Sequence, residues 1–379
     1  MTGGFVFSEK PIEIESGEGA SLYTPDGTEY LDFGASYAVA ALGHSHPAVT
    51  TAVQEQVARL TYVQASYPVE VRTELYQKLA TLAPGDVDNV WLCNSGTEAN
   101  EAAMKFARSA TGRSKIVATK RGFHGRTMGA LAMTWKDKYK KPFEPLAGDI
   151  EFVPYGDAEA LAEAVDEETA AVFLEPVQGE GGIHPAATEY LERAREATDE
   201  TGAALVFDEI QTGVGRTGDL WACEGSGVEP DILTSAKGIA NGLPLGATLV
   251  KDWIAENPGN HGSTFSGGPV VCAAANATLD AIVEEDVPGN AARVGEYLQH
   301  ELATATEEHD LPVREIRGLG LMIGVEVKRG ANRVLKNLAL QEQVLALPAG
   351  RTVVRLLPPL TIDESHADQF VDSFVEVLG

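Results

Sequence analysis

The sequence predicts an α/β fold made of a large domain with a mostly parallel central sheet and a smaller α+β domain. Short apolar runs alternate with helical patterns, which is typical of a parallel sheet covered on both faces. The chain has 379 residues, of which 44% are hydrophobic and 22% charged. That length and composition suit two globular domains rather than a disordered chain.

Several short apolar runs have the length and composition of buried strands. In chain order they are residues 90–93, 116–118, 170–174, 203–207, 232–234 and 246–250. Between and after them lie helical patterns at residues 98–110, 188–201, 270–284 and 291–308, and two further strands at 321–327 and 352–356. We therefore expect an N-terminal segment, residues 1–47, that joins the small domain, a large domain at 48–269 and a C-terminal small domain at 270–379.

The charge balance excludes some classes of partner. The 56 Asp and Glu outnumber the 29 Lys and Arg and give a formal net charge of -27. General affinity for nucleic acid or an anionic membrane needs a positive surface, so neither is expected. The first residues lack the features of a secretory signal, and we expect a cytoplasmic protein. A salt-rich, halophilic milieu is our hypothesis for the acidic excess.

One basic segment interrupts this acidic chain. Between Lys105 and Lys141 there are eleven Lys and Arg and a single acid, Asp137. Such a segment indicates an anion to bind, an acidic partner surface or compensating salt bridges. Metal binding is not expected, because the three cysteines have no ligand spacing and the pair His44 and His46 lacks neighbouring ligands.

The first candidate site lies between a predicted strand and a helix. Ser95 and Thr97 are N-cap residues, and Gly96 allows a ligand to approach the backbone. Free N–H groups at a helix start bind anions, and the anion expected here is a phosphate. Ordinary helix capping would also explain this pattern.

The second and third candidates follow two later strands. Asp208 directly follows the run 203–207, at the carboxyl end of a predicted strand, where open parallel sheets bind ligands. Gly213 to Gly218 match a dinucleotide-binding pattern, but no helix is predicted after them, so we reject that match. Lys237 follows the run 232–234, where a desolvated lysine can lose its proton and form an imine. An anion cradle, a carboxylate and this lysine are the groups that pyridoxal phosphate requires.

Seven motifs then make the chain resemble a fold-type I pyridoxal-phosphate enzyme, specifically a class III aminotransferase of the acetylornithine and ornithine group. They occur in order almost from end to end, and their joint occurrence is highly specific. The motifs are Leu42-Gly-His-Ser-His-Pro47, Asn94-Ser-Gly-Thr-Glu-Ala-Asn-Glu-Ala102, Gly122-Phe-His-Gly-Arg-Thr127, Leu174-Glu-Pro-Val-Gln-Gly-Glu-Gly-Gly182, Phe207-Asp-Glu-Ile-Gln-Thr-Gly-Val-Gly-Arg-Thr-Gly218, Ser235-Ala-Lys-Gly238 and His261-Gly-Ser-Thr-Phe265.

The resemblance implies roles for the catalytic residues. Lys237 would bond to the aldehyde carbon of the cofactor and, once a substrate displaces it, move the proton between substrate and cofactor. Asp208 would pair with the pyridine nitrogen and keep it protonated. Gln211 would hydrogen-bond the phenolic oxygen.

It also implies how the cofactor is held. Phe123 and Ile210 would lie on the two faces of the ring. Gly96 and Thr97 would bind the phosphate of their own subunit's cofactor. Thr264 would bind the phosphate in the neighbouring subunit, which makes a homodimer with shared active sites the expected assembly.

Substrate residues follow from the same resemblance. Arg126 would grip a substrate carboxylate, and Arg355 would bind the α-carboxylate of glutamate or pair with Glu180 when an ω-amino substrate is bound. Tyr37 lies where ornithine enzymes carry a pocket tyrosine. Phe7 falls near another tyrosine of those enzymes, so that hydroxyl is absent here.

The resemblance leaves the substrate open. Residues 263–269 read Ser-Thr-Phe-Ser-Gly-Gly-Pro where the family usually has Ser-Thr-Phe-Gly-Gly-Asn-Pro. We expect exchange between glutamate/2-oxoglutarate and N-acetylornithine/N-acetylglutamate semialdehyde, as in arginine biosynthesis. The alternatives are ornithine or lysine on a small acidic carrier protein, free ornithine or another ω-amino acid, and a racemase or aminomutase. Outside the family, a nicotinamide dehydrogenase would depend on the rejected glycine pattern.

Overall fold

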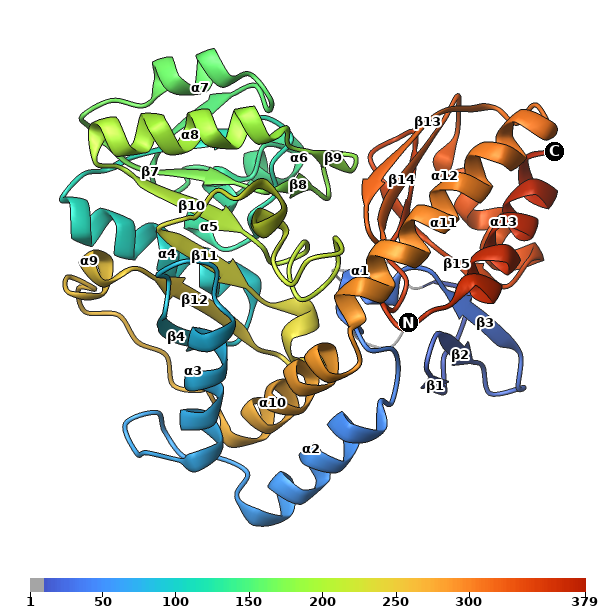
Figure 1. The fold of residues 1–379 in the computed structure, drawn as a ribbon, viewed down its shortest axis with the longest axis horizontal. Helices are drawn as coiled ribbons and strands as arrows, with labels where there is room; N and C mark the ends of the chain where they lie inside the picture. The colour runs from blue at the N-terminus through green and yellow to red at the C-terminus, as the bar shows by residue number, and fades with distance from the viewer. Residues whose placement is uncertain (1–9) are drawn as a thin grey trace.

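A seven-stranded sheet forms the centre of the computed structural model, which describes residues 10–379 (Figure 1). Its strands in spatial order are β4 (Asn89–Cys93), β12 (Gly246–Val250), β11 (Ile232–Ser235), β10 (Ala204–Asp208), β7 (Thr169–Leu174), β5 (Lys115–Thr119) and β6 (Asp149–Val153). Neighbouring strands are parallel except that β12 is antiparallel to both β11 and β4. The mostly parallel sheet predicted from the sequence is confirmed.

Helices cover both faces of this sheet, as the alternation of strands and helices predicted. In β10, Leu205 and Phe207 belong to the core cluster that contains Leu191 of α8 (Thr188–Thr201). Val206, on the opposite face, belongs with Phe106 of α4 (Gly96–Thr111) in a second cluster. Because alternate residues of one strand enter two different cores, the strand reads as an uninterrupted apolar run.

Strand β6 was missed in the sequence for a physical reason. It is the edge strand, and its sequence Asp149-Ile-Glu-Phe-Val153 alternates acidic and apolar residues. An edge strand needs to bury only one row of side chains, so it carries no continuous apolar run.

A second antiparallel sheet lies towards the C-terminus, and we call it the C-terminal sheet. Its order is β13 (Val313–Leu319), β14 (Met322–Val327), β17 (Val353–Leu356) and β16 (Leu347–Ala349). Helices α11 (Val287–Glu308), α12 (Ala331–Gln341) and α13 (Glu364–Leu378) lie beside it (Figure 1). Strands β14 and β17 were predicted, whereas β13 was not, because its sequence Val-Arg-Glu-Ile-Arg-Gly-Leu is largely polar.

The two ends of the chain share a small sheet. Its strands β1 (Ser16–Glu18), β2 (Ser21–Tyr23) and β3 (Glu29–Asp32) are completed by β15 (Val344–Leu345), which pairs with β3 in parallel. The pairing brings the N-terminal segment against the C-terminal part of the chain. Helices α2 (Pro47–Arg59) and α3 (Glu70–Leu82) both pack against α10 (Pro269–Glu284).

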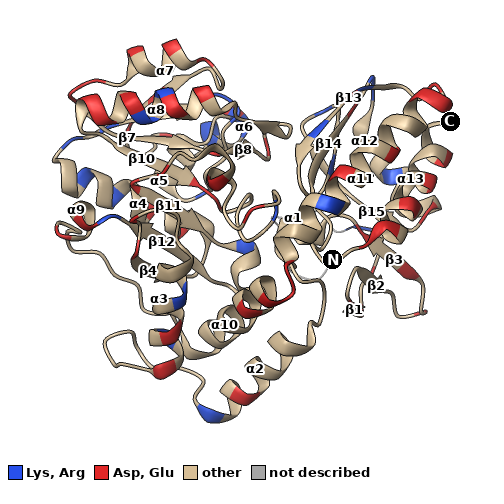
Figure 2. Ribbon diagram, in the orientation of Figure 1, with Lys and Arg blue, Asp and Glu red and all other residues tan. Residues whose placement is uncertain are grey.

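Several short elements complete the described part of the chain. They are α1 (Ala35–Ala38), α5 (Met128–Met133), α6 (Asp137–Lys140), η1 (Lys141–Phe143), α7 (Ala158–Ala164), β8 (Val177–Gln178), β9 (His184–Pro185), η2 (Ala222–Ser226), η3 (Lys237–Ala240) and α9 (Asp252–Ala255). Of the described helices, none combines the length and apolarity needed to cross a membrane. Acidic residues are spread over helices α7, α8, α11 and α13, whereas Lys and Arg gather around α6 (Figure 2).

Candidate active site

Three candidate residues meet at one edge of the central sheet. Asp208 is the last residue of β10, Lys237 follows β11, and helix α4 begins at Gly96 after β4. These three strands are parallel to one another, so their carboxyl ends lie together. This is the edge at which open α/β sheets bind ligands.

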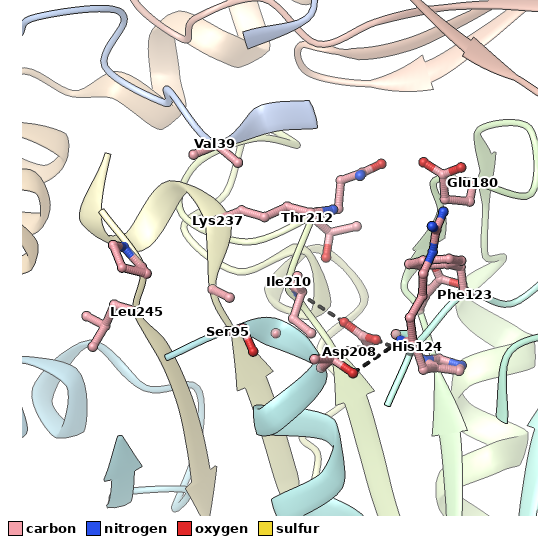
Figure 3. A pocket seen from close by; sticks show the side chains of 18 of the residues that line it. Val39, Ser95, Phe123, His124, Glu180, Asp208, Ile210, Thr212, Lys237 and Leu245 are labelled. Atoms are coloured by element: carbon pink, nitrogen blue, oxygen red, sulfur yellow. Dashed lines mark hydrogen bonds and ion pairs between the residues drawn. The ribbon is translucent and has the colours of Figure 1, made fainter. Parts of the chain in front are cut away.

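A cavity of about 460 Å³ opens there. Ten of the thirteen residues singled out in the sequence line it, and these are Ser95, Gly96, Thr97, Phe123, Arg126, Glu180, Asp208, Ile210, Gln211 and Lys237. Figure 3 shows Lys237 extending from one side of the cavity, while Asp208 and His124 lie together on another. The lining runs from Val39 to Leu245, so segments about 200 residues apart in the chain form one site.

A buried hydrogen-bond network fixes the carboxylate of Asp208. Its Oδ2 accepts from Asn100 Nδ2 and from His124 Nδ1, each at 2.7 Å. Its Oδ1 accepts from the backbone N–H of Ile210 at 3.1 Å. Asn100 is itself held by Thr234, whose hydroxyl donates to Asn100 Oδ1 at 2.9 Å. These hydrogen bonds fix the orientation of the Asp208 carboxylate, whose oxygens can still accept a hydrogen bond from a ligand in the cavity.

Two neighbouring groups have shifted pKa values. Burial would lower the pKa of His124, but the hydrogen bond and charge of Asp208 outweigh it and raise that pKa. Burial raises the pKa of Glu175 to about 7, with the Asp208 charge adding to the effect. Glu175 accepts from the backbone N–H of Phe123 at 3.0 Å and of Gly179 at 3.3 Å. It therefore links two segments of the cavity wall.

Lys237 is held in an unusual backbone conformation. Its φ of 47° lies in the left-handed region, which costs a residue with a side chain free energy and often marks a functional position. Burial lowers the pKa of its amine to about 8. The Glu180 charge opposes this shift and the Arg355 charge adds to it. Within residues 10–379 the amine forms no ion pair, so it is free to react.

The start of α4 is built to leave N–H groups free. The hydroxyl of Ser95 accepts from Glu98 N at 3.4 Å, and the Glu98 carboxylate accepts from Asn94 N at 2.8 Å. The N–H groups of Gly96 and Thr97 belong to the first turn, where no helical carbonyl precedes them. At Gly96 a Cβ would lie 2.8 Å from Ile210 carbons, so only glycine allows this close approach.

Arg355 does not line the cavity but lies behind it. Its side chain is 0% exposed, and Nη2 donates to Glu180 Oε1 at 2.7 Å. Nη1 donates to Gln211 Oε1 at 3.1 Å. The guanidinium carbon is 5.3 Å from the ring centre of Tyr37. Burial would raise the pKa of Glu180, but the Arg355 charge outweighs it and keeps that pKa below its usual value.

Two further expectations fall outside this cavity. Thr264 is absent from the cavity lining, and its carbonyl accepts from the Tyr62 hydroxyl. Phe7 lies outside the described residues. The glycine-rich stretch from Gly213 to Gly218 forms turns rather than the start of a helix, in agreement with the rejection of a dinucleotide site.

Sequence reasoning assigned no role to three residues of the site. Asn100, His124 and Glu175 all occur inside motifs that were recognised, but they contact Asp208 or the cavity wall only through the fold. Asn100 could have been found, because it is a polar residue among the alanines of a buried helix face.

The model of the family "Aminotransferase class-III" matches residues 7–378. The chain belongs to the class III aminotransferases. It is therefore an aminotransferase with fold-type I architecture, as the motifs indicated, and it acts on an amino acid and a 2-oxoacid.

Relatives of this class III aminotransferase have different substrates in their names. A [LysW]-aminoadipate semialdehyde transaminase of Deinococcus radiodurans is 45% identical over 99% of this chain and 87% of its own length. An acetylornithine aminotransferase of Methanopyrus kandleri is 44% identical over 98% of this chain and 95% of its own. The similarity to both is nearly equal, so sequence identity does not select the substrate.

A solved structure indicates the cofactor of this class III aminotransferase. The ornithine aminotransferase of Toxoplasma gondii, described with partial occupancy of pyridoxal phosphate in its active site, superposes with a TM-score of 0.92. It is 32% identical, and the match covers 97% of this chain and 90% of that one. The cofactor is pyridoxal phosphate, and the cavity fits it: the buried Lys237 amine, which has no ion-pair partner among residues 10–379, a buried carboxylate and the first-turn N–H groups of α4 surround one space.

Proposed function

We propose that this aminotransferase moves an amino group between glutamate/2-oxoglutarate and the terminal amine of N-acetylornithine, in arginine biosynthesis. The pairing of Glu180 with Arg355 carries the proposal. Within residues 10–379 the fully buried guanidinium of Arg355 has a single carboxylate partner, Glu180, which lines the cavity, so it can exchange that partner for a substrate carboxylate. One pocket then accepts both a dicarboxylate and an amine-bearing chain.

The proposed cofactor roles follow the geometry. When bound, pyridoxal phosphate supplies an electrophilic carbon and a protonated ring that withdraws electrons. The first-turn N–H groups of Gly96 and Thr97 hold its phosphate. Asp208, aimed by Asn100 and His124, holds the proton on the ring nitrogen.

The remaining roles belong to the walls of the cavity. Phe123 and Ile210 line it and exclude water from the two faces of the ring. Gln211 binds the phenolic oxygen through its amide nitrogen, since its Oε1 accepts from Arg355. Lys237, with a pKa of about 8, moves the proton between the amine-bearing carbon of the substrate and the cofactor.

The proposed substrate-binding residues act differently in the two half-reactions. With glutamate bound, Arg355 leaves Glu180 and takes the α-carboxylate. With an ω-amino substrate bound, Glu180 keeps Arg355 neutralised, and Tyr37 covers its guanidinium. Arg126, exposed at the rim with its guanidinium carbon 4.6 Å from the Tyr139 ring centre, grips the distal carboxylate.

A half-reaction screen tests this proposal. The loss of the absorbance of the bound cofactor is followed with N-acetylornithine, ornithine, lysine, γ-aminobutyrate and glutamate. We expect fast reaction with N-acetylornithine and glutamate, and release of 2-oxoglutarate from glutamate. A lack of reaction with N-acetylornithine would overturn the substrate, and isomerised glutamate without 2-oxoglutarate would indicate a racemase or aminomutase.

A second candidate substrate is ornithine or lysine carried on a small acidic protein. The observation that favours it is a group of four lysines in and around α6, which we call the cationic rim: Lys136, Lys138, Lys140 and Lys141. Tyr139 packs edge-on against Phe123, which lines the cavity, and their ring centres are 5.9 Å apart. Lys138 Nζ lies 4.7 Å from the Tyr139 ring centre. Lys138 and Lys141 are exposed. On a chain with a net charge of -27, such a rim attracts an anionic surface to the mouth of the site.

The test leaves one rim lysine in place. Lys136 donates to the backbone carbonyl of Glu180 at 2.8 Å, so replacing it would disturb the pocket itself. The rim variant instead changes Lys138, Lys140 and Lys141 to Gln. Its control changes a matched set of three exposed or half-exposed arginines elsewhere to Gln, namely Arg193, Arg293 and Arg314.

Two substrates separate the candidates. One is N-acetylornithine, and the other is ornithine joined through its α-amine to a peptide of several glutamates. For a carrier-directed enzyme, the rim variant loses roughly tenfold in kcat/KM with the peptide at low ionic strength and nothing with N-acetylornithine. Equal losses with both substrates, or equal losses in the control, remove the carrier from consideration.

The proposed assembly is a homodimer with shared active sites. Tyr62 and Phe265 are exposed neighbours with ring centres 5.4 Å apart, and Tyr67 is also exposed. Buried Arg72 ties their loops together by donating to Gly267 O at 2.6 Å and Tyr67 O at 2.9 Å. An exposed aromatic patch on a rigid base suits a subunit interface. A monomer by light scattering, with full activity after Thr264→Arg, would contradict this assembly.

A further inference from the structure

Two arginines and one glycine form a row across the C-terminal sheet. Arg317 of β13 pairs in register with Gly324 of β14, and Gly324 pairs with Arg355 of β17. Residues directly opposite on neighbouring strands point to the same face of a sheet. The two arginines therefore flank the glycine on one face.

The segment that carries Glu180 docks on this row. It is the β8–β9 hairpin, residues 177–185, which extends from the central sheet towards the C-terminal sheet (Figure 1). Arg317 Nε donates to Ile183 O at 2.8 Å, and Arg317 Nη2 donates to Gly182 O at 2.7 Å. At Gly324 a Cβ would lie 2.9 Å from Ile183 Cβ, so the glycine leaves the space in which the hairpin rests.

Arg317 is itself fixed by its own sheet. Its Nη1 donates to Glu315 at 2.6 Å and to Glu326 at 2.9 Å. These glutamates lie opposite each other on β13 and β14, where two like charges need a cation between them. The Arg317 side chain is 11% exposed. The planar guanidinium of Arg317 therefore binds the two glutamate carboxylates through Nη1 and the backbone carbonyls of the hairpin through Nε and Nη2.

We propose that Arg317 and Gly324 are specificity-determining positioning residues that dock the β8–β9 hairpin and so hold Glu180 on Arg355. This inference rests on the proposed exchange of Arg355 between Glu180 and the α-carboxylate of glutamate. Arg317 contacts no substrate, and it acts through the hairpin backbone. Its role is to set how strongly Glu180 competes with glutamate.

The physical reason is effective concentration. A carboxylate on a docked hairpin stays within 2.7 Å of its guanidinium, whereas one on a loosened hairpin spends time elsewhere. Loosening the hairpin therefore frees Arg355 for glutamate and leaves it uncompensated beside an ω-amino substrate. The two half-reactions change in opposite directions, which general damage to the fold would not produce.

The test compares Arg317→Gln with wild type in both half-reactions on the holoenzyme. We expect kcat/KM for glutamate divided by kcat/KM for the ω-amino substrate to rise about tenfold, corresponding to the loss of charged hydrogen bonds. The dicarboxylate glutarate, which cannot react, should bind the variant more tightly by calorimetry. Arg314→Gln is the matched control, because Arg314 lies on the same strand and its single ion pair within the described chain is with Glu326, at 3.6 Å.

A double-variant cycle shows whether the effect passes through Glu180. Glu180→Gln alone should raise the same ratio, and adding Arg317→Gln to it should change the ratio little further. Arg317→Lys keeps the charge between the two glutamates but loses the planar guanidinium, so it should fold and still raise the ratio. An unchanged ratio in Arg317→Lys, or full additivity in the double variant, overturns the inference.

The outcomes also separate this inference from the proposed function. If wild type reacts with neither N-acetylornithine nor any other ω-amino substrate, the proposed function fails. Suppose instead that wild type reacts with glutamate and with an ω-amino substrate, and that Glu180→Gln alters the ratio of the two kcat/KM values. If the Arg317 variants then leave that ratio unchanged, only the docking role fails.

Discussion

The amine of Lys237 should become reactive at a lower pH than an ordinary lysine. Burial lowers its pKa from the usual 10.5 to about 8. At pH 7 the neutral fraction is then about one in ten, compared with about one in three thousand for an unperturbed lysine. The rate at which cofactor attaches covalently to the cofactor-free protein should be about 300-fold higher than an ordinary lysine would allow.

The assay is stopped-flow absorbance after mixing cofactor with the stripped protein between pH 6 and 11. Rates are divided by those of a simple lysine derivative at each pH, which removes the pH dependence of the cofactor itself. We expect a midpoint near 8. Because the Glu180 charge raises this pKa, Glu180→Gln should move the midpoint down. A midpoint above about 10, near that of an ordinary lysine, would refute desolvation as the controlling effect.

Four further outcomes follow from the site and the charge. Asp208→Asn should lower kcat by about 100- to 1000-fold by removing the charge that holds the ring proton, while cofactor still binds; a smaller loss would contradict that role. Gly96→Ala places a Cβ within 2.8 Å of Ile210 and should weaken cofactor binding by about tenfold or more in a fluorescence titration, and unchanged affinity would contradict the close approach. Burial raises the pKa of Glu175 from 4.5 to about 7, so the native protein binds the extra proton and its free energy of unfolding falls as pH rises from 4.5 to 7. Glu175→Gln should remove about 3 kcal/mol of that decline in urea titrations, and parallel pH profiles would count against it. A net charge of -27 predicts unfolding in dilute buffer and stability in molar salt, whereas equal melting temperatures would reject the halophilic hypothesis.

The strands of the central sheet were predictable where they are buried on both faces. The predicted run at residues 203–207 is apolar throughout, and its alternate residues enter two cores, so its hydrophobicity identifies it. Strands β6 and β13 were not predictable, because an edge or an exposed face lets charged residues into the strand. Missing β13 also hid the contacts of Arg317, because its partner Glu326 lies on β14 and can be assigned only when the two strands are paired.

Some residues of the site were also predictable from the sequence, and others were not. Lys237, Asp208 and the start of α4 were found because each follows a predicted strand, and parallel strands bring their carboxyl ends together. The roles of Asn100 and His124 were not found, because nothing local in the chain indicates that both would point at one carboxylate oxygen.

The sequence by itself determined the α/β class, the family and ten of the residues that line the cavity, since these depend on apolar periodicity and on motifs of contiguous residues. Only the tertiary structure decided how those residues are oriented and controlled. The pairing of Arg355 with Glu180 joins residues 175 positions apart, and the Arg317 row acts on Glu180 from a third segment. Hydrogen bonds and charge interactions act over a few ångströms in space, and separation along the chain does not predict which groups come that close.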